Sequence, residues 1–282
     1  MSIDIVRAEL TIAKQGWERF RRDPKKYGSG VAKLYLFSLL EPTNKKHCQL
    51  ASHSRAAYEL VRRVDDILDG DEDAPKGKDP KEFALDIQRQ IQTGDFDYLT
   101  PLSHLAKYAV NSLESRQEEG RNVRQEFVAA INPLVFDYDR RGERRVLTTS
   151  ELEQYYWDSF RPITEIMLIA LGSKWKAEDI REFGLMQPRV YSVRDYFDDY
   201  NSGIVNIPKE VMDFASYDAS HSASTVWHNE YVQQWIGSQL DQAKKEADSL
   251  EVKLTTCEER YTVMFCKGPV GTVRKIIRDY ST

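Results

Sequence analysis

Two pairs of aspartates could do chemistry in this chain of 282 residues. Asp65 and Asp69 form the first pair, and Asp195 and Asp199 form the second. The members of each pair are four residues apart, a spacing that places both carboxylates on one face of a helix. Carboxylates on a partly buried face are costly unless they are ion-paired or hold a cation. Both pairs are therefore candidate cation ligands.

The residue types indicate which cation this would be. Oxygen ligands without His or Cys favour Mg²⁺ over zinc, and Mg²⁺ is typically held by one or two carboxylates together with substrate phosphates. An arginine accompanies each pair, because Arg62 lies three residues before Asp65 and Arg194 directly precedes Asp195. Two facing acidic helices would clamp a metal-bound diphosphate. The alternative interpretation is that both groups are solvated, acidic helix ends.

Amphipathic helices must position these residues. Apolar residues at helical spacing, with Pro, Gly and capping residues at the ends, predict helices over 3–22, 31–40, 44–69, 81–92, 101–116, 121–139, 150–171, 177–199, 222–250 and 257–280. Ser150 and Glu153 have the spacing of a capping box at the start of the helix 150–171. No repeat, low-complexity tract or linker divides the chain, which predicts one all-α domain over residues 1–282.

Composition excludes several classes of protein. The 40 Lys and Arg against 45 Asp and Glu give a net charge of −5, which argues against general nucleic-acid binding. The low content of 14 Gly and 10 Pro argues against a turn-rich β-sandwich. Three widely spaced cysteines fit a reducing compartment. No apolar run approaches the roughly 20 residues of a membrane helix. We therefore expect a soluble, cytoplasmic protein without a transmembrane anchor.

Three segments of the sequence resemble motifs of one family. Residues 58–69, YELVRRVDDILD, look like the first aspartate-rich motif of the squalene/phytoene synthase family, Y-x-x-x-R-x-(I/V)-D-D-x-x-D. Residues 194–208, RDYFDDYNSGIVNIP, look like the second, R-D-x-x-(E/D)-D-x-x-x-G-x-x-x-(L/I)-P. Between them, residues 151–157 resemble the family segment E-L-x-x-Y-C-Y. The resemblance covers residues 58–208, with weaker similarity at both ends.

This resemblance implies an all-α class I isoprenoid (terpenoid) synthase fold, a helical bundle with a central cavity. It also implies that Mg²⁺ ions bind the diphosphate of a farnesyl- or geranylgeranyl-type substrate, held by Asp65, Asp69, Asp195 and Asp199. Arg62 and Arg194 are the implied diphosphate contacts. Metal and basic residues would stabilise the departing diphosphate, and an allylic carbocation would remain in an apolar pocket.

The sequence departs from the family pattern at the expected prenyl pocket. Phe160 and Arg161 stand where the family usually has Ala and Gly, and Tyr191 stands where it usually has Asn. This crowding favours cyclisation of one C15 or C20 prenyl diphosphate. The alternative is a prenyltransferase that condenses two prenyl diphosphates head-to-head or prenylates another acceptor. A non-catalytic helical bundle that binds prenyl lipids or a partner protein is a third hypothesis. The sequence leaves the oligomeric state open.

Further candidates for substrate binding lie on the same predicted helices. The aromatic faces of Tyr155, Phe160 and Tyr191 would stabilise a carbocation, or they are ordinary core residues. Arg161 would sense the diphosphate, or it forms a salt bridge with Asp158 or Glu165 on its own helix.

The charged residues between the predicted helices 121–139 and 150–171 are expected to be less informative. The basic run 140–145 is interpreted as a solvated loop, with a cavity mouth that attracts diphosphates as the alternative. Asp137 and Asp139 are interpreted as structural, because a spacing of two does not place them on one helix face.

Overall fold

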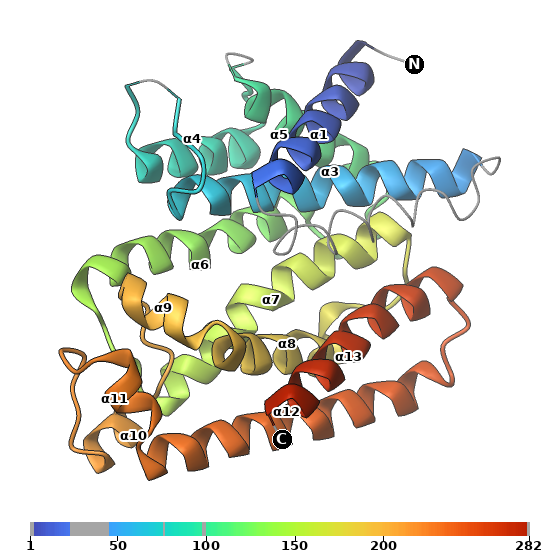
Figure 1. Cartoon of the computed structure of the whole chain (residues 1–282). Helices are drawn as coiled ribbons and strands as arrows, with labels where there is room; N and C mark the ends of the chain where they lie inside the picture. The colour runs from blue at the N-terminus through green and yellow to red at the C-terminus, as the bar shows by residue number, and fades with distance from the viewer. Residues whose placement is uncertain (1–2, 23–44, 76, 98–99, 281–282) are drawn as a thin grey trace. The chain divides into compact units, whose positions relative to one another are not determined.

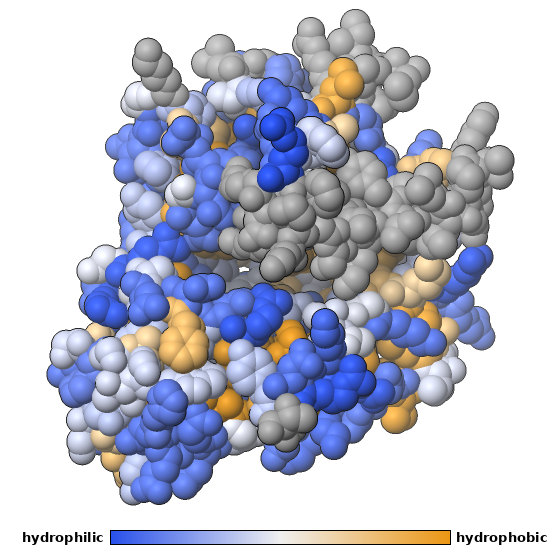
Figure 2. All heavy atoms as spheres, viewed as in Figure 1, coloured by the Kyte–Doolittle hydropathy of each residue, from blue (hydrophilic) through white to orange (hydrophobic). Residues whose placement is uncertain are grey.

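The computed structural model of the protein describes residues 3–22, 45–75, 77–97 and 100–280. These residues form helices and no strand, which confirms the all-α prediction. Within the same ranges, no helix has the length and apolar character needed to cross a membrane. Among the coloured residues in Figure 2, most of those on this face are hydrophilic and the apolar ones form smaller patches, in keeping with a mean hydropathy of −0.59 for the whole sequence.

The described chain forms two compact units, and each of them is built from packed helices. The first unit comprises the described residues up to 131 together with 165–174. Its helices are α1 (Ile3–Arg22), α3 (Lys45–Leu68), α4 (Pro80–Thr93), α5 (Pro101–Glu114), the first part of α6 (Val123–Glu143) and the end of α7 (Thr149–Leu171). Within this unit, α5 packs against α1, α3 and α4 (Figure 1).

The second unit comprises residues 132–164 and the described residues from 175 onward. Its complete helices are α8 (Arg181–Arg194), α9 (Tyr196–Ser202), α10 (Lys209–Phe214), α11 (Ala223–Trp227), α12 (Glu230–Leu254) and α13 (Arg260–Tyr280), with a 3₁₀ turn, η1 (Ala177–Ile180), before α8. In this unit α8 lies along α12, and α13 packs against both (Figure 1). The prediction of a single domain over 1–282 stays a prediction.

Most predicted helices are present, but two are interrupted. The predicted helix 177–199 is divided into η1, α8 and α9, and the predicted helix 222–250 is divided into α11 and α12. The predicted helix 31–40 lies outside the described residues. Helix α10 was not predicted, and α6 extends four residues beyond the expected end at 139.

The capping box of α7 uses other residues than predicted. Thr148 and Glu151 form it, because the Thr148 amide donates to Glu151 Oε2 at 2.8 Å and the Glu151 amide donates to Thr148 Oγ1 at 3.3 Å. The prediction of Ser150 and Glu153 as the box is wrong. Glu153 is bound instead by Arg189 of α8.

The lowered pKa of His53 leads to a prediction of how acid affects the stability of the first unit. It lies on α3, with its ring 6.2 Å from that of Tyr108 on α5. Burial, and then the positive charge of Arg116, lower the pKa of His53 from 6.5 to about 4. Between these two pH values the unfolded chain gains a proton that folded His53 does not bind. We therefore expect the free energy of unfolding to fall as the pH is lowered from 6.5 to about 4.

Urea denaturation of wild type and His53→Gln at pH 7 and pH 5 tests this expectation. The Gln side chain has no proton to gain in this range, so the variant should lose less stability between the two pH values. An equal loss in both proteins would assign the acid sensitivity to other groups.

Candidate functional site

The first acidic motif lies at the carboxyl end of α3. Asp65 belongs to the last turn of the helix, and the Asp69 amide donates to the Asp65 carbonyl at 2.8 Å, so helical geometry continues to Asp69. The predicted relation therefore holds, with both residues on one face. The apolar residues of this segment form the core beneath it, because Val61, Val64, Ile67 and Leu68 are all buried.

Arg62 joins two carboxylates of this motif. It pairs with Asp65 and also, at 2.9 Å, with Asp66, whose side chain is fully buried. Asp65 is mostly buried, with 23% of its side chain exposed. Asp66 thus balances part of the charge of Arg62. The sequence had suggested only a diphosphate as the partner of this arginine.

The second acidic motif lies where α8 meets α9. Asp195 has a backbone conformation outside the regular helix and separates the two elements. The hydrogen bonds nevertheless continue, from the Asp195 amide to the Tyr191 carbonyl at 2.8 Å and from the Asp199 amide to the Asp195 carbonyl at 2.9 Å. Asp195 and Asp199 therefore remain one turn apart on one face, as predicted.

Arg194 connects this motif to aromatic side chains. Its guanidinium donates to both carboxylate oxygens of Asp195, and these hydrogen bonds raise the pKa of Arg194. The same guanidinium lies over the ring of Tyr191, 4.4 Å from its centroid, and that ring is 6.1 Å from the ring of Phe160. Three of the predicted substrate-binding residues are thus brought together beside Asp195.

The other predicted substrate-binding residues of this unit have different neighbours. Tyr155 donates to Asp137 Oδ2 at 2.5 Å and packs beside Phe136, with ring centroids 5.9 Å apart. Arg161 forms an ion pair with Glu178 of η1 at 3.8 Å. Glu165, one of its two expected partners, is bound by buried Arg121 at 2.6 Å in the first unit.

The prediction that the basic run 140–145 is a solvated loop is wrong for its first part, whereas residues 142–145 are exposed and residues 144–145 lie outside the helix. Residues 140–143 belong to α6, and Arg140 is only 1% exposed. Its Nε donates to Asp137 at 2.7 Å, and its guanidinium lies over the ring of Tyr155, 4.5 Å from the centroid. Asp137 is therefore part of a polar cluster around the buried Arg140. The three-residue spacing of Asp137 and Arg140 on a helix was the signal that could have predicted it.

The end of α6 also contacts the end of α9. Gly203 has φ +98°, and a Cβ atom there would lie 2.2 Å from the Arg141 carbonyl oxygen, so a side chain at this position would force the backbone apart. Arg144 donates to the Tyr200 carbonyl at 3.0 Å, where a cation stabilises the negative end of a helix. The basic run thus anchors the chain that leaves the second acidic motif.

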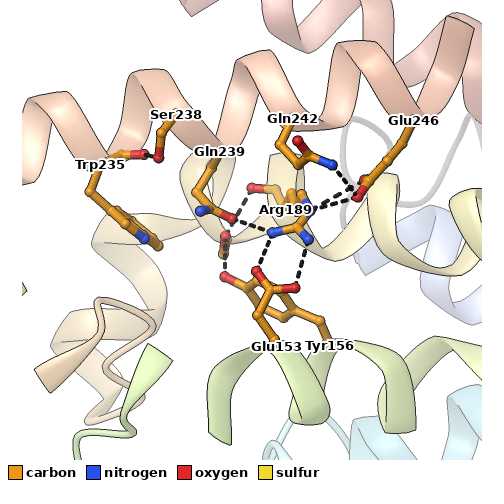
Figure 3. Close-up of polar contacts among 9 residues, drawn as sticks. Glu153, Tyr156, Arg189, Trp235, Ser238, Gln239, Gln242 and Glu246 are labelled. Atoms are coloured by element: carbon orange, nitrogen blue, oxygen red, sulfur yellow. Dashed lines mark hydrogen bonds and ion pairs between the residues drawn. The ribbon is translucent and has the colours of Figure 1, made fainter. Parts of the chain in front are cut away.

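Arg189 holds α8 in place from the other side. Figure 3 shows its guanidinium between Glu153 of α7 and Glu246 of α12. It donates to both Glu153 oxygens, at 2.5 and 2.6 Å, and its Nε donates to the Glu246 carboxylate at 3.1 Å. Gln239 of α12 accepts a further bond at 2.8 Å. Sequence reasoning missed this cluster, because Arg189 is 36 to 57 residues from the partners that it binds.

The two motifs suit a hard cation by their donor atoms. Each offers two carboxylates on one helix face, and Mg²⁺ is typically held by one or two carboxylates with phosphate oxygens. Among the described residues, no group of three or more His, Cys, Asp or Glu side chains could hold a metal. Two carboxylates do not complete the coordination of Mg²⁺, so either motif would need further oxygen ligands. The first motif belongs to the first unit and the second motif to the second.

Comparison with protein families finds a match over most of the chain. A model of the squalene/phytoene synthase family matches residues 47–280, a range that contains both acidic motifs and most of the chain. A search of curated proteins finds no match. Enzymes of this family have a helical isoprenoid synthase fold, act on prenyl diphosphates in head-to-head condensation-type chemistry, and typically use a divalent metal. The chain belongs to the squalene/phytoene synthase family.

Proposed function

We propose that this protein is a Mg²⁺-dependent class I terpenoid synthase. It ionises an allylic C15 or C20 prenyl diphosphate and cyclises the resulting cation with release of diphosphate. The observation that carries the proposal is the geometry of the two motifs, each with two aspartates on one helix face and an arginine bound to the first of them. The odd number of cysteines favours a reducing, cytoplasmic setting.

In this proposal the chain's own residues bind and orient the diphosphate. Asp65, Asp69, Asp195 and Asp199 would hold Mg²⁺, which supplies positive charge to the leaving group. Arg62 and Arg194 would contact the diphosphate oxygens. The allylic C–O bond breaks, and its electron pair leaves with the diphosphate. Arg194 already lies between Asp195 and Tyr191, so it can turn toward an anion without leaving the site.

The aromatic residues support the cyclase form of the proposal. Phe160 and Tyr191 lie ring to ring beside Arg194, where their faces would stabilise a cation by up to about 2 kcal/mol. Phe160 and Arg161 stand where the family pattern usually has Ala and Gly, and their larger side chains would leave less room for a second prenyl chain. The second candidate is head-to-head condensation, favoured by the family match over residues 47–280.

Incubation with farnesyl or geranylgeranyl diphosphate and Mg²⁺, followed by mass analysis of the products, tests the proposal. We expect free diphosphate and a C15 or C20 hydrocarbon, which forms when the cyclised cation loses a proton. A C30 or C40 product would instead establish condensation, and a prenylated acceptor would establish a transferase. If no prenyl diphosphate of any chain length releases diphosphate in a Mg²⁺-dependent reaction, both enzyme hypotheses are overturned. The hypothesis of a non-catalytic helical bundle then remains.

A further inference from the structure

The segment that follows α9 returns to the second acidic motif through Asn206. The Asn206 side chain accepts a hydrogen bond from Arg140 Nη2 at 2.8 Å and donates one to Asp199 Oδ2 at 3.0 Å. The three residues come from α6, from the segment after α9, and from α9 itself. A chain of two hydrogen bonds thus connects the buried end of α6 to a predicted metal ligand.

Only a side chain that both donates and accepts can make this connection. A guanidinium only donates and an ionised carboxylate only accepts, so the two bonds fix which way the amide is turned. The amide oxygen faces Arg140 and the amide nitrogen faces Asp199. The carboxylate of Asp199 is thereby oriented by a neutral group, which leaves its negative charge in place for a cation.

Arg140 is itself firmly held at the other end of this chain. Asp137 accepts from its Nε, and the rings of Tyr155 and Phe136 lie 4.5 and 5.6 Å from its guanidinium carbon. Among the described residues, no hydrogen-bond partner reaches its buried Nη1.

We infer that Asn206 is a positioning residue, which holds the Asp199 carboxylate in its orientation for a divalent cation and is itself fixed by Arg140. The inference rests on the proposed function, because it requires Asp199 to be a metal ligand. It adds to that function two residues that belong to neither aspartate pair. Hydrogen-bond partners of metal ligands typically contribute 10- to 100-fold to metal affinity or activity.

The test measures binding of Mg²⁺ to the protein in the presence of inorganic diphosphate, by titration calorimetry without a prenyl substrate. Asn206→Leu has nearly the same shape but neither bonding group, and we expect about 10- to 100-fold weaker Mg²⁺ binding. Asn201→Leu is the matched control, since it makes the same change at an exposed position of α9 and should bind Mg²⁺ like wild type. Asn206→Gln, which restores the amide, should recover part of the affinity.

The outcomes separate this inference from the proposed function. Equal Mg²⁺ affinity in wild type and Asn206→Leu would overturn the inference, whereas no Mg²⁺ binding by wild type would overturn the function. Thermal unfolding monitors the fold of each variant. If Asn206→Leu is unfolded, Arg140→Lys decides between the outcomes. Lysine keeps a positive charge beside Asp137, but its single nitrogen replaces the two separate nitrogens, Nε and Nη2, that bind Asp137 and Asn206. Weaker Mg²⁺ binding supports the inference, and unchanged binding refutes it.

Discussion

An Arg189→Met variant is expected to lose about 3–5 kcal/mol of the free energy of unfolding. Arg189 is buried, and its removal leaves the Glu246 carboxylate, 8% exposed, without its positive partner. Burial already raises the pKa of Glu246 above 4.5 in the presence of Arg189. The deficit should therefore shrink as the pH falls toward 4.5, since protonation of Glu246 in the folded state removes the buried charge. Urea denaturation at several pH values measures both effects.

A surface arginine provides the matched control. Arg274 of α13 also binds two carboxylates of α12, Asp248 at 2.8 Å and Glu251 at 2.6 Å, but 44% of its side chain is exposed. Arg274→Met should cost less than about 1 kcal/mol, because exposed ion pairs contribute little. The double variant Arg189→Met/Glu246→Met should regain much of the loss, since apolar replacement of a buried pair is often neutral. Similar costs for Arg189→Met and Arg274→Met would contradict the importance of burial.

The clearest success of the sequence is the geometry of the two aspartate pairs. A spacing of four residues decides which helix face a side chain occupies, so the relation of Asp65 to Asp69 needs no knowledge of the rest of the fold. The relation of Asp195 to Asp199 even survives the break between α8 and α9, because the hydrogen bonds of the backbone continue through Asp195. The position of that break was not predictable, since neither Pro nor Gly marks it.

The start of α7 shows what local pattern cannot decide. Both Thr148–Glu151 and Ser150–Glu153 have the spacing of a capping box. The choice between them depends on Glu153, which is bound by Arg189, a residue 36 positions away. An ion pair with a residue far away in the sequence thus distinguishes two capping boxes that have the same spacing.

The start of the basic run 140–145 was misinterpreted for a similar reason. Four arginines with Gly142 have the composition of a solvated loop. Arg140 is buried nevertheless, because its guanidinium has partners within the fold. Asp137 and Asn206, which is 66 residues away in the sequence, accept hydrogen bonds from it, and the ring of Tyr155 packs against it. Charge alone predicts exposure only when no such partners exist elsewhere in the fold.

Asp65→Asn and Asp195→Asn are each expected to lower the rate of Mg²⁺-dependent diphosphate release by about 10³-fold. The metal contributes several kcal/mol of charge stabilisation to the leaving group, and each 1.36 kcal/mol corresponds to a factor of ten in rate. The fold should be retained. Asp195 and its partner Arg194 are 38% and 47% exposed, so loss of their ion pair costs little, and Arg62 keeps Asp66 as a partner when Asp65 is changed.

Two aspartates outside the motifs make this prediction specific. Asp86 resembles Asp65, because 21% of its side chain is exposed and an arginine three residues away, Arg89, is bound to it. Asp213 resembles Asp195 in being an ion-paired residue at an exposed position, with Lys209 as its partner. Asp86→Asn and Asp213→Asn should release diphosphate at the wild-type rate. Full activity in either motif variant would remove that aspartate from the metal site. An equal loss of activity in the control variants would show that the effect comes from the change in net charge. A metal ligand, in contrast, requires a carboxylate at its own position in the motif.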